Sequence, residues 1–552
     1  MITDELEHLV ATALEAAAAD GIVEAPPLGA IAFERPRRRE HGDWATNIAL
    51  VAAKSGGSPR PIAEAILARL PPSDLVDEVE VAGPGFLNFR LSPRWLQDVV
   101  RRAARPGSGF GRTASGAGTR INVEYVSANP TGPINVVSGR QAAVGDAIAN
   151  LLEAAGHEVT REFFVNDAGL QATLFARSVA ARYLEQLGRE GEIPPEGYHG
   201  DYVSELAQAI VAEHGERWLD ATDEDREQAM RSLALPHMLE QMKSSLERFG
   251  TVFDIWFSES ELHRSGAVDE SVDALRAKGF IDDRDGAAWF RSSALGDDKD
   301  RVIVRSNGEP TYLAGDTAYL ADKFGRGFEH LVYLWGPDHH GTIPRLLAAA
   351  EALGFDRSRV EVQLVQVVTL TRGGEAVKAS KRAGMIVPLD ELVSEVGKDA
   401  ARYTFLTRSL DTHLEFDLEL AKVQAPENPV YYVQYAHARI CSILRRAAES
   451  GVEPDAAAAP LDRLEHPSEV ELMRMVASFE EVVPDAAGLR APQRLARYVE
   501  ELASTFTGFY RDCRVVSDDV DLTQARLALC LAARGVIADG LAMLGVSAPE
   551  KM

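Results

Sequence analysis

Cysteine is scarce in this 552-residue chain, and long apolar runs are missing from it. The three cysteines, at positions 441, 513 and 530, stand apart from one another. They offer neither a disulfide framework nor a Cys-x-x-Cys zinc site, so we expect no structural zinc and no protein-bound metal. No run reaches the ~18 apolar residues that a membrane-spanning helix needs. Because the N-terminus is acidic, unlike a secretion signal, we expect a soluble, cytoplasmic protein without a membrane partner.

Positive charge is also in short supply. The chain has 58 lysine and arginine residues against 84 aspartate and glutamate residues, which gives a formal net charge of −26 at pH 7. Such an excess opposes non-specific attraction to nucleic-acid phosphates, so any nucleic-acid partner must bind at a local basic surface. At roughly 100 to 200 residues per domain, the length predicts three or four domains.

Changes in composition along the chain predict three domains. Residues 1–105 combine an opening helix with short strands, which indicates a small α+β domain. A glycine-rich connector leads to a second domain over residues 118–410. From about residue 411 onward the pattern contains helices and no strands, so we expect an all-α helical bundle over residues 411–552.

The second domain opens with a strand, a loop, a helix and a second strand. This βαβ unit spans residues 121–165 and places both strands in one parallel sheet. Further strands are expected at residues 331–334 and 360–370. We interpret the charged, helix-rich stretch from about 170 to 300 as an insertion into the sheet. The predicted fold class is therefore α/β: a Rossmann-type parallel-sheet catalytic domain with a helix-rich insertion, flanked by the α+β domain and the bundle.

The loop inside the βαβ unit carries the most informative sequence. Residues 127–138 read Ser-Ala-Asn-Pro-Thr-Gly-Pro-Ile-Asn-Val-Val-Ser. A loop between the carboxyl end of a parallel strand and a helix N-terminus favours an anionic ligand such as phosphate. The alternative is an ordinary βα loop in which Ser138 is the helix N-cap. From loop position alone the two interpretations are evenly balanced, and a P-loop pattern is absent.

Several segments resemble the class I arginyl-tRNA synthetase family. Residues 123–133 resemble its first signature region, and 335–341, Trp-Gly-Pro-Asp-His-His-Gly, are similar to its Gly-x-Asp-His-His stretch. Residues 377–384, Val-Lys-Ala-Ser-Lys-Arg-Ala-Gly, resemble its second signature. Residues 428–439 and 548–552 are also similar to family sequences. The resemblance covers essentially the whole chain and implies a bacterial member of the family.

By this resemblance, the enzyme is a ligase. It activates L-arginine with ATP, supplied as a complex with Mg²⁺, and transfers the arginine to the 3′ end of tRNA(Arg) in protein synthesis. The family expectation is a monomer. The carboxylate of arginine attacks the α-phosphate directly, so positioning and electrostatics carry the acceleration without a protein nucleophile.

The two signatures are implied to form the ATP site. Three cations of the second signature, Lys378, Lys381 and Arg382, are suited to neutralise charge on the leaving pyrophosphate, although such a cluster alone is usually a solvated basic turn. The implied ATP-binding residues are Pro130, Thr131, Gly132, Asn135, Ser138, Asp338, His339, His340 and Lys381. The implied catalytic residues are Lys378, Ser380, Lys381, Arg382, Asn135 and Ser138.

The first signature departs from the family at its end. Family members carry a His-x-Gly-His-like tetrad there, whose imidazoles hydrogen-bond ATP as pyrophosphate leaves, whereas this chain has Asn135-Val136-Val137-Ser138. Asn and Ser donate only neutral hydrogen bonds, and losing a charge-assisted donor costs about 1.5 to 3 kcal/mol. The departure motivates an alternative, a catalytically weakened paralogue that acts as a tRNA-binding or regulatory protein. A third hypothesis keeps adenylation but transfers arginine to another acceptor.

Arginine recognition requires particular groups. A guanidinium is a planar fork of donors, so its site should offer a carboxylate and a neutral acceptor. Tyr312 and Asp316 resemble the family segment that lines the amino-acid pocket, and Asp316 is our candidate partner of the guanidinium. Glu124 and Asn129 match family positions near the substrate backbone. For an arbitrary Tyr-x-x-x-Asp, a helix cap or a solvent-exposed pair is the alternative.

Two tyrosines are expected to contact the anticodon loop of tRNA. Tyr432 and Tyr435 lie on a predicted helix that begins near Pro429, and they match family positions that face this loop. Aromatic rings stack on unpaired bases of any identity. An aromatic stripe on a helix is more often part of a core, so we expect Tyr431 to pack inward while the other two face out.

The first domain carries the densest basic run of the chain, which includes Arg37, Arg38 and Arg39. A family-like stretch at residues 41–47 follows it. By resemblance, this domain would contact the outer corner of the tRNA through these arginines. The alternative is a solvated basic loop, which is about as frequent for such a run.

Overall fold

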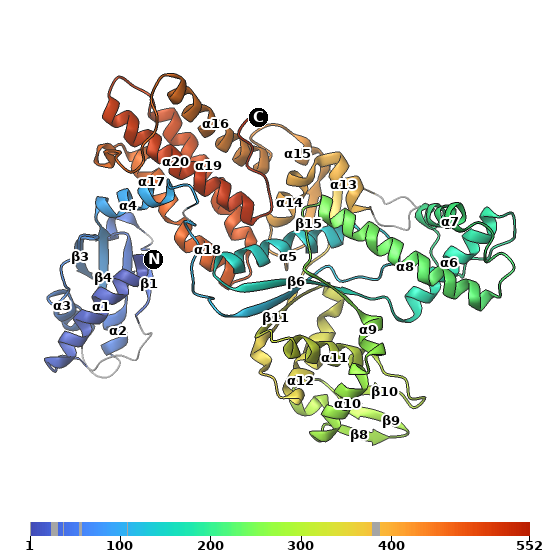
Figure 1. The fold of residues 1–552 in the computed structure, drawn as a ribbon. Helices are drawn as coiled ribbons and strands as arrows, with labels where there is room; N and C mark the ends of the chain where they lie inside the picture. The colour runs from blue at the N-terminus through green and yellow to red at the C-terminus, as the bar shows by residue number, and fades with distance from the viewer. Residues whose placement is uncertain (1, 24–30, 37, 54–57, 108, 378–386) are drawn as a thin grey trace.

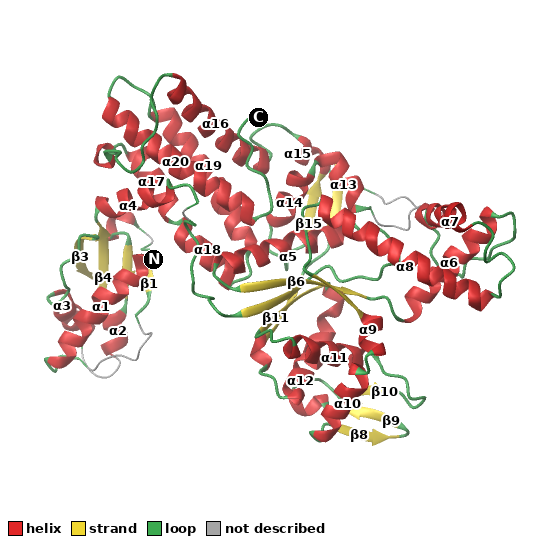
Figure 2. Cartoon of the chain, viewed as in Figure 1, coloured by secondary structure: helices red, strands yellow, loops and turns green. Residues whose placement is uncertain are grey.

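The structure is a computed structural model, and it describes residues 2–23, 31–36, 38–53, 58–107, 109–377 and 387–552. Figures 1 and 2 show a small N-terminal body beside a helical bundle, and a parallel sheet from which two further groups of elements extend. The described helices include none that is long and apolar enough to cross a membrane.

The N-terminal body is α+β, as the sequence predicted. Its antiparallel sheet has the order β1-β2-β4-β3. Helix α1 buries one stripe of apolar residues that includes Leu6, Val10 and Leu14, because side chains three and four positions apart share a helix face. The elements are α1 (Ile2–Ala19), β1 (Phe33–Glu34), the 3₁₀ helix η1 (Arg39–His41), β2 (Trp44–Thr46), α2 (Ile48–Ala52), α3 (Pro59–Leu67), β3 (Val76–Ala82), β4 (Phe86–Leu91) and α4 (Pro93–Ala103).

The central sheet is parallel and has the order β12-β11-β5-β6-β7. The predicted βαβ unit is β5, α5 and β6, and helix α5 is buried along almost its whole length. The chain extends the sheet from β5 to one side and later returns to add β11 and β12 on the other. The elements are β5 (Arg120–Glu124), α5 (Val136–Ala154), β6 (Glu158–Val165), β7 (Ile255–Ser258), β11 (His330–Trp335) and β12 (Val360–Leu364).

The stretch from 170 to 300 differs from a single helical insertion. Three helices do follow β6, but β7 then returns to the sheet, and β8, β9 and β10 form a separate antiparallel sheet. Strands of four residues are too short to show a clear period in sequence. The elements are α6 (Gly169–Gln186), α7 (Asp201–His214), α8 (Asp223–Arg248), α9 (Glu259–Arg264), α10 (Ala267–Ala277), β8 (Ile281–Arg284), β9 (Ala287–Phe290), β10 (Arg301–Val304), α11 (Tyr312–Gly325) and α12 (Ile343–Leu353).

From residue 411 onward the elements are helices, with the exception of one strand. Strand β15 (Leu414–Asp417) pairs in parallel with β13, so the expectation that strands end at residue 411 is wrong. Leu414 and Phe416 are buried while Glu415 between them is exposed, which is the alternation of a half-buried strand. The other elements are β13 (Val368–Arg372), β14 (Glu375–Ala376), α13 (Leu389–Val396), α14 (Lys398–Leu406), α15 (Leu418–Lys422), α16 (Pro429–Glu449), α17 (Pro467–Ala477), α18 (Phe479–Gly488), α19 (Pro492–Asp512) and α20 (Val520–Met543).

A buried guanidinium joins the bundle to the sheet domain. Arg402 of α14 is fully buried and forms an ion pair with Asp146 of α5. It also donates to the carbonyl oxygens of Phe249 (3.2 Å) and Gly250 (3.1 Å), just beyond α8, and to that of Leu544 (3.5 Å), just beyond α20. One side chain therefore ties together three parts of the chain that are far apart in sequence.

Replacing Arg402 with leucine should destabilise the protein. The substitution removes the shorter of the two ion pairs of the Asp146 carboxylate, which keeps only Arg161 at 3.5 Å, and it leaves several buried carbonyl oxygens without their donor. We expect the free energy of unfolding to fall by about 3 kcal/mol, near the lower end of the cost of breaking a buried ion pair. Urea unfolding followed by tryptophan fluorescence measures the change. The control is Arg408→Leu, because Arg408 is exposed nearby on the chain. An unfolding midpoint of the Arg402 variant equal to that of the control would contradict the prediction.

Candidate active site

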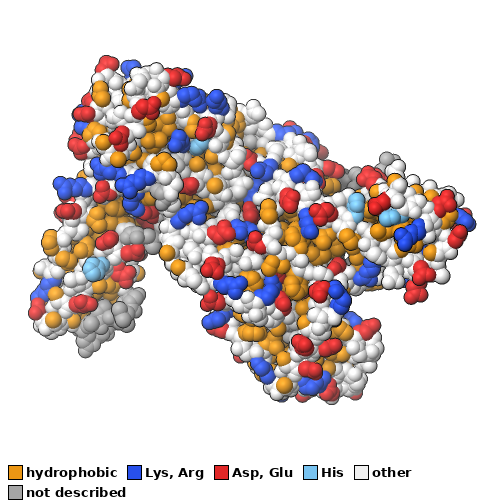
Figure 3. Space-filling view, in the orientation of Figure 1, with side chains coloured by type: hydrophobic (Ala, Val, Ile, Leu, Met, Phe, Trp, Pro, Cys, Tyr) orange, Lys and Arg blue, Asp and Glu red, His pale blue; other side chains and the backbone are white. Residues whose placement is uncertain are grey.

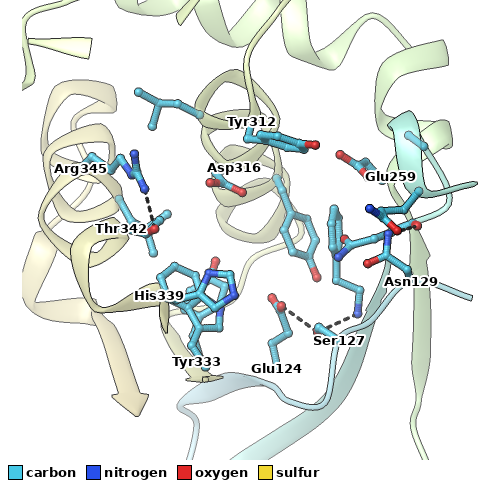
Figure 4. Close-up of a pocket in the computed structure, with 18 of the residues that line it drawn as sticks. Glu124, Ser127, Asn129, Glu259, Tyr312, Asp316, Tyr333, His339, Thr342 and Arg345 are labelled. Carbon is cyan, nitrogen blue, oxygen red and sulfur yellow. Dashed lines mark hydrogen bonds between the residues drawn. The ribbon is translucent and has the colours of Figure 1, made fainter. Parts of the chain in front are cut away.

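A cavity of about 480 Å³ opens at the carboxyl ends of β5, β6 and β11. The strand order reverses at β5, and ligands of open α/β sheets bind at such a reversal, outside the carboxyl ends of the strands. Figure 4 shows side chains from the sheet and from α11 and α12 pointing into this space. The polar and aromatic residues that line it are Glu124, Ser127, Asn129, Phe164, Asn166, Gln171, Glu259, Tyr312, Asp316, Tyr319, Tyr333, Trp335, His339, Thr342 and Arg345.

One face of α11 supplies a wall of the cavity. Tyr312, Asp316 and Tyr319 follow one another at spacings of four and three residues, so they lie in one row along the helix. Tyr312 is the first helical residue and is 75% exposed at the mouth of the cavity, whereas Tyr319 is buried. The row explains why the predicted pair, Tyr312 and Asp316, comes together in one site.

The cavity carries three carboxylates, and they differ in their partners. Glu124 accepts hydrogen bonds from Ser127 Oγ (2.9 Å) and from Lys323 Nζ (2.6 Å). Asp316 makes no hydrogen bond or ion pair within the described part of the chain. Burial, and then repulsion from Glu124, raise the pKa of Asp316 to about 7. Burial also raises the pKa of Glu259. A half-buried carboxylate without a partner favours a cationic ligand.

Helix α12 contributes a positively charged side chain to the lining of the cavity. Arg345 donates to Thr342 Oγ1 at 2.6 Å, and its charge opposes the rise in the pKa of Asp316. Figure 4 places Arg345 and Glu259 on opposite sides of Asp316. Of the three predicted residues at 338–340, His339 lines the cavity, whereas Asp338 and His340 are exposed and lie outside its lining.

The loop after β5 has a strained backbone. Val126 and Ser127 have φ values of 70° and 26°, in a region that β-branched residues rarely adopt. This turn places Ser127 Oγ where it donates to Glu124 and accepts the N–H of Phe164 at 3.1 Å, so the loop is joined to both β5 and β6. Sequence reasoning missed Ser127, because no local pattern signals a hydroxyl held by a strained turn. Asn129 lines the cavity and donates to the Asn166 carbonyl at 3.1 Å.

The altered end of the first signature caps helix α5. Asn135 is the N-cap, and its Oδ1 accepts the N–H of Ser138 at 2.9 Å. The alternative interpretation, in which Ser138 is the N-cap, therefore places the cap three residues too far along the chain. Ile134 and Val136 pair with Leu389 and Val387, which directly follow residues 378–386.

The predicted ATP residues do not all gather in the cavity. Pro130, Thr131, Gly132, Asn135 and Ser138 are absent from its lining, and the Tyr202 hydroxyl covers the loop by donating to the Thr131 carbonyl at 2.9 Å. The second-signature residues Lys378, Ser380, Lys381 and Arg382 lie outside the described residues.

The tyrosines of α16 are arranged differently from the expectation. Tyr431 and Tyr435 stack on each other, with ring centroids 6.0 Å apart, and Tyr435 is 39% exposed. Tyr432 packs against the core, and its hydroxyl donates to Thr507 Oγ1 at 3.4 Å. The reason is helical geometry: residues four apart share a face, and the adjacent residue is turned by about 100°. Tyr431 therefore lies with Tyr435, and Tyr432 is the ring that turns inward.

The basic run of the N-terminal body is only partly described. Arg37 and the side chain of Arg39 lie outside the described residues. Arg38 is exposed and pairs with Glu40 at 3.3 Å. Arg35, in the same run, forms a bidentate ion pair with Glu481 of the bundle. On the face seen in Figure 3, acidic and basic side chains are interspersed.

Family models match three consecutive parts of the chain. The model described as the arginyl-tRNA synthetase N-terminal domain matches residues 4–91. The catalytic domain of class I (R) tRNA synthetases matches residues 108–413, and the DALR anticodon-binding domain matches residues 433–552. The chain belongs to the arginyl-tRNA synthetase family. As a family member it has the class I fold, so the predicted fold class is confirmed.

Curated relatives of this arginyl-tRNA synthetase family member match it over its whole length. A protein named arginine–tRNA ligase from Heliobacterium modesticaldum is 46% identical over 557 residues, which cover 100% of this chain and 99% of that protein. Its namesake from Carboxydothermus hydrogenoformans is 48% identical over 539 residues, or 97% of each. The arginyl-tRNA synthetase structure from Thermus thermophilus shares the fold, with a TM-score of 0.77 at 23% identity over 100% of both chains.

Arginine binding should weaken as the pH falls through 7. Protonation of Asp316, whose pKa is about 7, would remove the charge that attracts a guanidinium, so the dissociation constant should rise about fivefold between pH 7 and pH 6. Calorimetric titration with arginine in buffers of different ionisation enthalpy measures both the affinity and the protons released. Asp316→Asn should abolish the pH dependence. An affinity that stays constant between pH 6 and pH 8 would show that this carboxyl does not bind the cation.

Proposed function

We propose that this protein is an arginine–tRNA ligase in which Asp316 binds the guanidinium of the substrate. The observation that supports this role is the unpartnered Asp316 carboxylate inside the cavity at the strand-order reversal. Its neighbours Glu124 and Tyr312 supply further acceptors, and Asn129 holds the α-amino end of arginine. A guanidinium is the ligand whose several donors suit this set of oxygens, whereas the single ammonium of lysine would leave some of them unpaired.

The chemistry proceeds without a protein nucleophile. A carboxylate oxygen of arginine attacks the α-phosphorus of ATP, and the bond from that phosphorus to the oxygen bridging the β-phosphorus breaks as pyrophosphate leaves. The terminal hydroxyl of tRNA then attacks the carbonyl carbon of the adenylate and releases AMP, with its proton passing to solvent. The protein contributes alignment of the reacting atoms and stabilisation of the charge that develops on the leaving groups.

The ATP site is proposed at the meeting of the two signatures. Asn135 uses its amide oxygen for the cap on α5, which leaves its amide N–H group to donate to a phosphate. Residues 134–136 contact residues 387–389, which belong to the first described segment after the second signature. Mg²⁺ is proposed to enter as a complex with the triphosphate, as the family resemblance implies.

The tRNA is proposed to extend from the catalytic domain (118–410) to the bundle (411–552), where Tyr435 and its stacked partner Tyr431 offer an exposed ring surface. The N-terminal domain (1–105) contributes Arg38 and its neighbours. We propose that the protein acts as a monomer, which is the family expectation. The full-length relatives give no support to the alternative of a weakened paralogue.

Pyrophosphate exchange with ATP should require arginine and tRNA together. In this assay, Asp316→Ala should raise the arginine KM by about 100-fold, because an interaction of a charged pair is lost, and should change the ATP KM by about twofold at most. Asp322→Ala is the matched control, since Asp322 lies on the same helix but pairs with Arg326. Equal effects on both KM values would remove Asp316 from the guanidinium role, and absence of exchange in the wild type would refute the proposed function.

Histidines restored at positions 135 and 138 should give little benefit. Because Asn135 already caps α5, the double change Asn135→His with Ser138→His removes a cap worth about 1 kcal/mol, and we expect a gain in kcat of no more than about threefold. Steady-state aminoacylation measures the effect. Asn135→Ser keeps a capping hydroxyl and serves as the control. A gain of tenfold or more would instead identify the natural signature as a degraded site.

A further inference from the structure

A buried ammonium group contacts residues of the cavity wall but does not itself line the cavity. Lys323 of α11 has a side chain with 0% exposure, and its Nζ lies 2.6 Å from Glu124 Oε2. The same nitrogen lies 4.3 Å from the ring centroid of Tyr319 and 4.0 Å from that of Tyr333. All three partners line the cavity. Three cavity residues therefore converge on one cation that has no contact with solvent.

The ammonium leaves Glu124 in a defined orientation. One carboxylate oxygen accepts from Lys323 and the other from Ser127, so the carboxylate is held at both oxygens and directs its remaining lone pairs toward the cavity. Asp316, seven residues before Lys323 on the same helix face, has no such partner. The two carboxylates thus have different tasks: one is held by the protein, and the other awaits a cation.

We propose that Lys323 is a positioning residue for arginine recognition, which acts by holding Glu124 in place; this rests on the proposed function. Removing the ammonium frees Glu124 and leaves three carboxylates in the cavity lining, where Arg345 is the lining arginine. The rings of Tyr319 and Tyr333 lose the cation between them as well. Arginine binding should then fall, while ATP, which binds elsewhere in the proposal, is held as before.

The test compares Lys323→Met with Arg326→Met in the tRNA-dependent exchange assay. Arg326, three residues on, pairs with the buried Glu162 at 2.7 Å, so its variant also breaks an ion pair of α11 but leaves Glu124 alone. Lys323→Met should raise the arginine KM by about 30-fold or more and the ATP KM by about twofold at most, whereas Arg326→Met should change both by about threefold at most. Equal arginine effects of the two variants, or an unchanged arginine KM for Lys323→Met, would overturn the proposal.

A second comparison decides the matter if Lys323→Met fails to fold. Glu124→Gln with Lys323→Met forms a neutral pair, so its arginine KM should lie within about threefold of that of Glu124→Gln alone, because Lys323 acts through Glu124. A large further loss in this background, or failure of the double variant to fold, would assign Lys323 a purely structural role. If the wild type shows exchange and the Lys323 variants keep the wild-type arginine KM, only this inference is refuted. If the wild type shows no exchange, the proposed function itself is refuted.

Discussion

Buried cations that bind groups from distant parts of the chain are the constraint on which this architecture depends. Arg402 joins α14 to α5, to the end of α8 and to the end of α20, through Asp146 and three carbonyl oxygens. Arg140 does the same from the buried α5, with hydrogen bonds of 2.8 to 2.9 Å to the carbonyls of Gln366, Ser409 and Thr412. Because an unpaired buried charge is strongly destabilising, each cation permits only arrangements that bring its partners together.

Arg140 and Arg402 differ in the groups that accept their hydrogen bonds. Arg140 has carbonyl partners and forms no ion pair with the residues that the structure describes, and burial lowers its pKa to about 10. Arg402 has a carboxylate partner in addition to its carbonyls. Both residues place α5 against the elements that follow the second signature. The helix that begins at the altered signature is therefore held by one guanidinium group near its start, at Arg140, and by another at its middle, where Arg402 pairs with Asp146.

Around the cavity, the arrangement of ionisable side chains favours ligand binding and lowers the stability of the folded protein. Glu162 keeps a lowered pKa despite burial, because Arg326, Lys323 and Tyr319 surround it. Asp316 lacks such partners, and because its pKa is raised to about 7, the folded protein loses stability as the pH rises from the ordinary pKa of an aspartate toward 7. A binding site commonly keeps such an unsatisfied group, which the ligand then satisfies. The strained backbone at Val126 and Ser127 belongs to the same region.

The fold class, the βαβ unit, the family, and the pairing of Tyr312 with Asp316 can all be predicted from the amino-acid sequence, because these depend on local periodicity or on contiguous motifs. Packing between elements is needed to know which ring of α16 turns inward, that Asn135 caps α5, and that β15 returns to pair with β13. It also decides that Ser127 and Lys323 hold Glu124. Lys323 lies 199 positions after Glu124, and no local pattern reports a contact across that separation. The physical reason is that partners of buried charges are chosen by packing between elements, which a one-dimensional pattern does not contain.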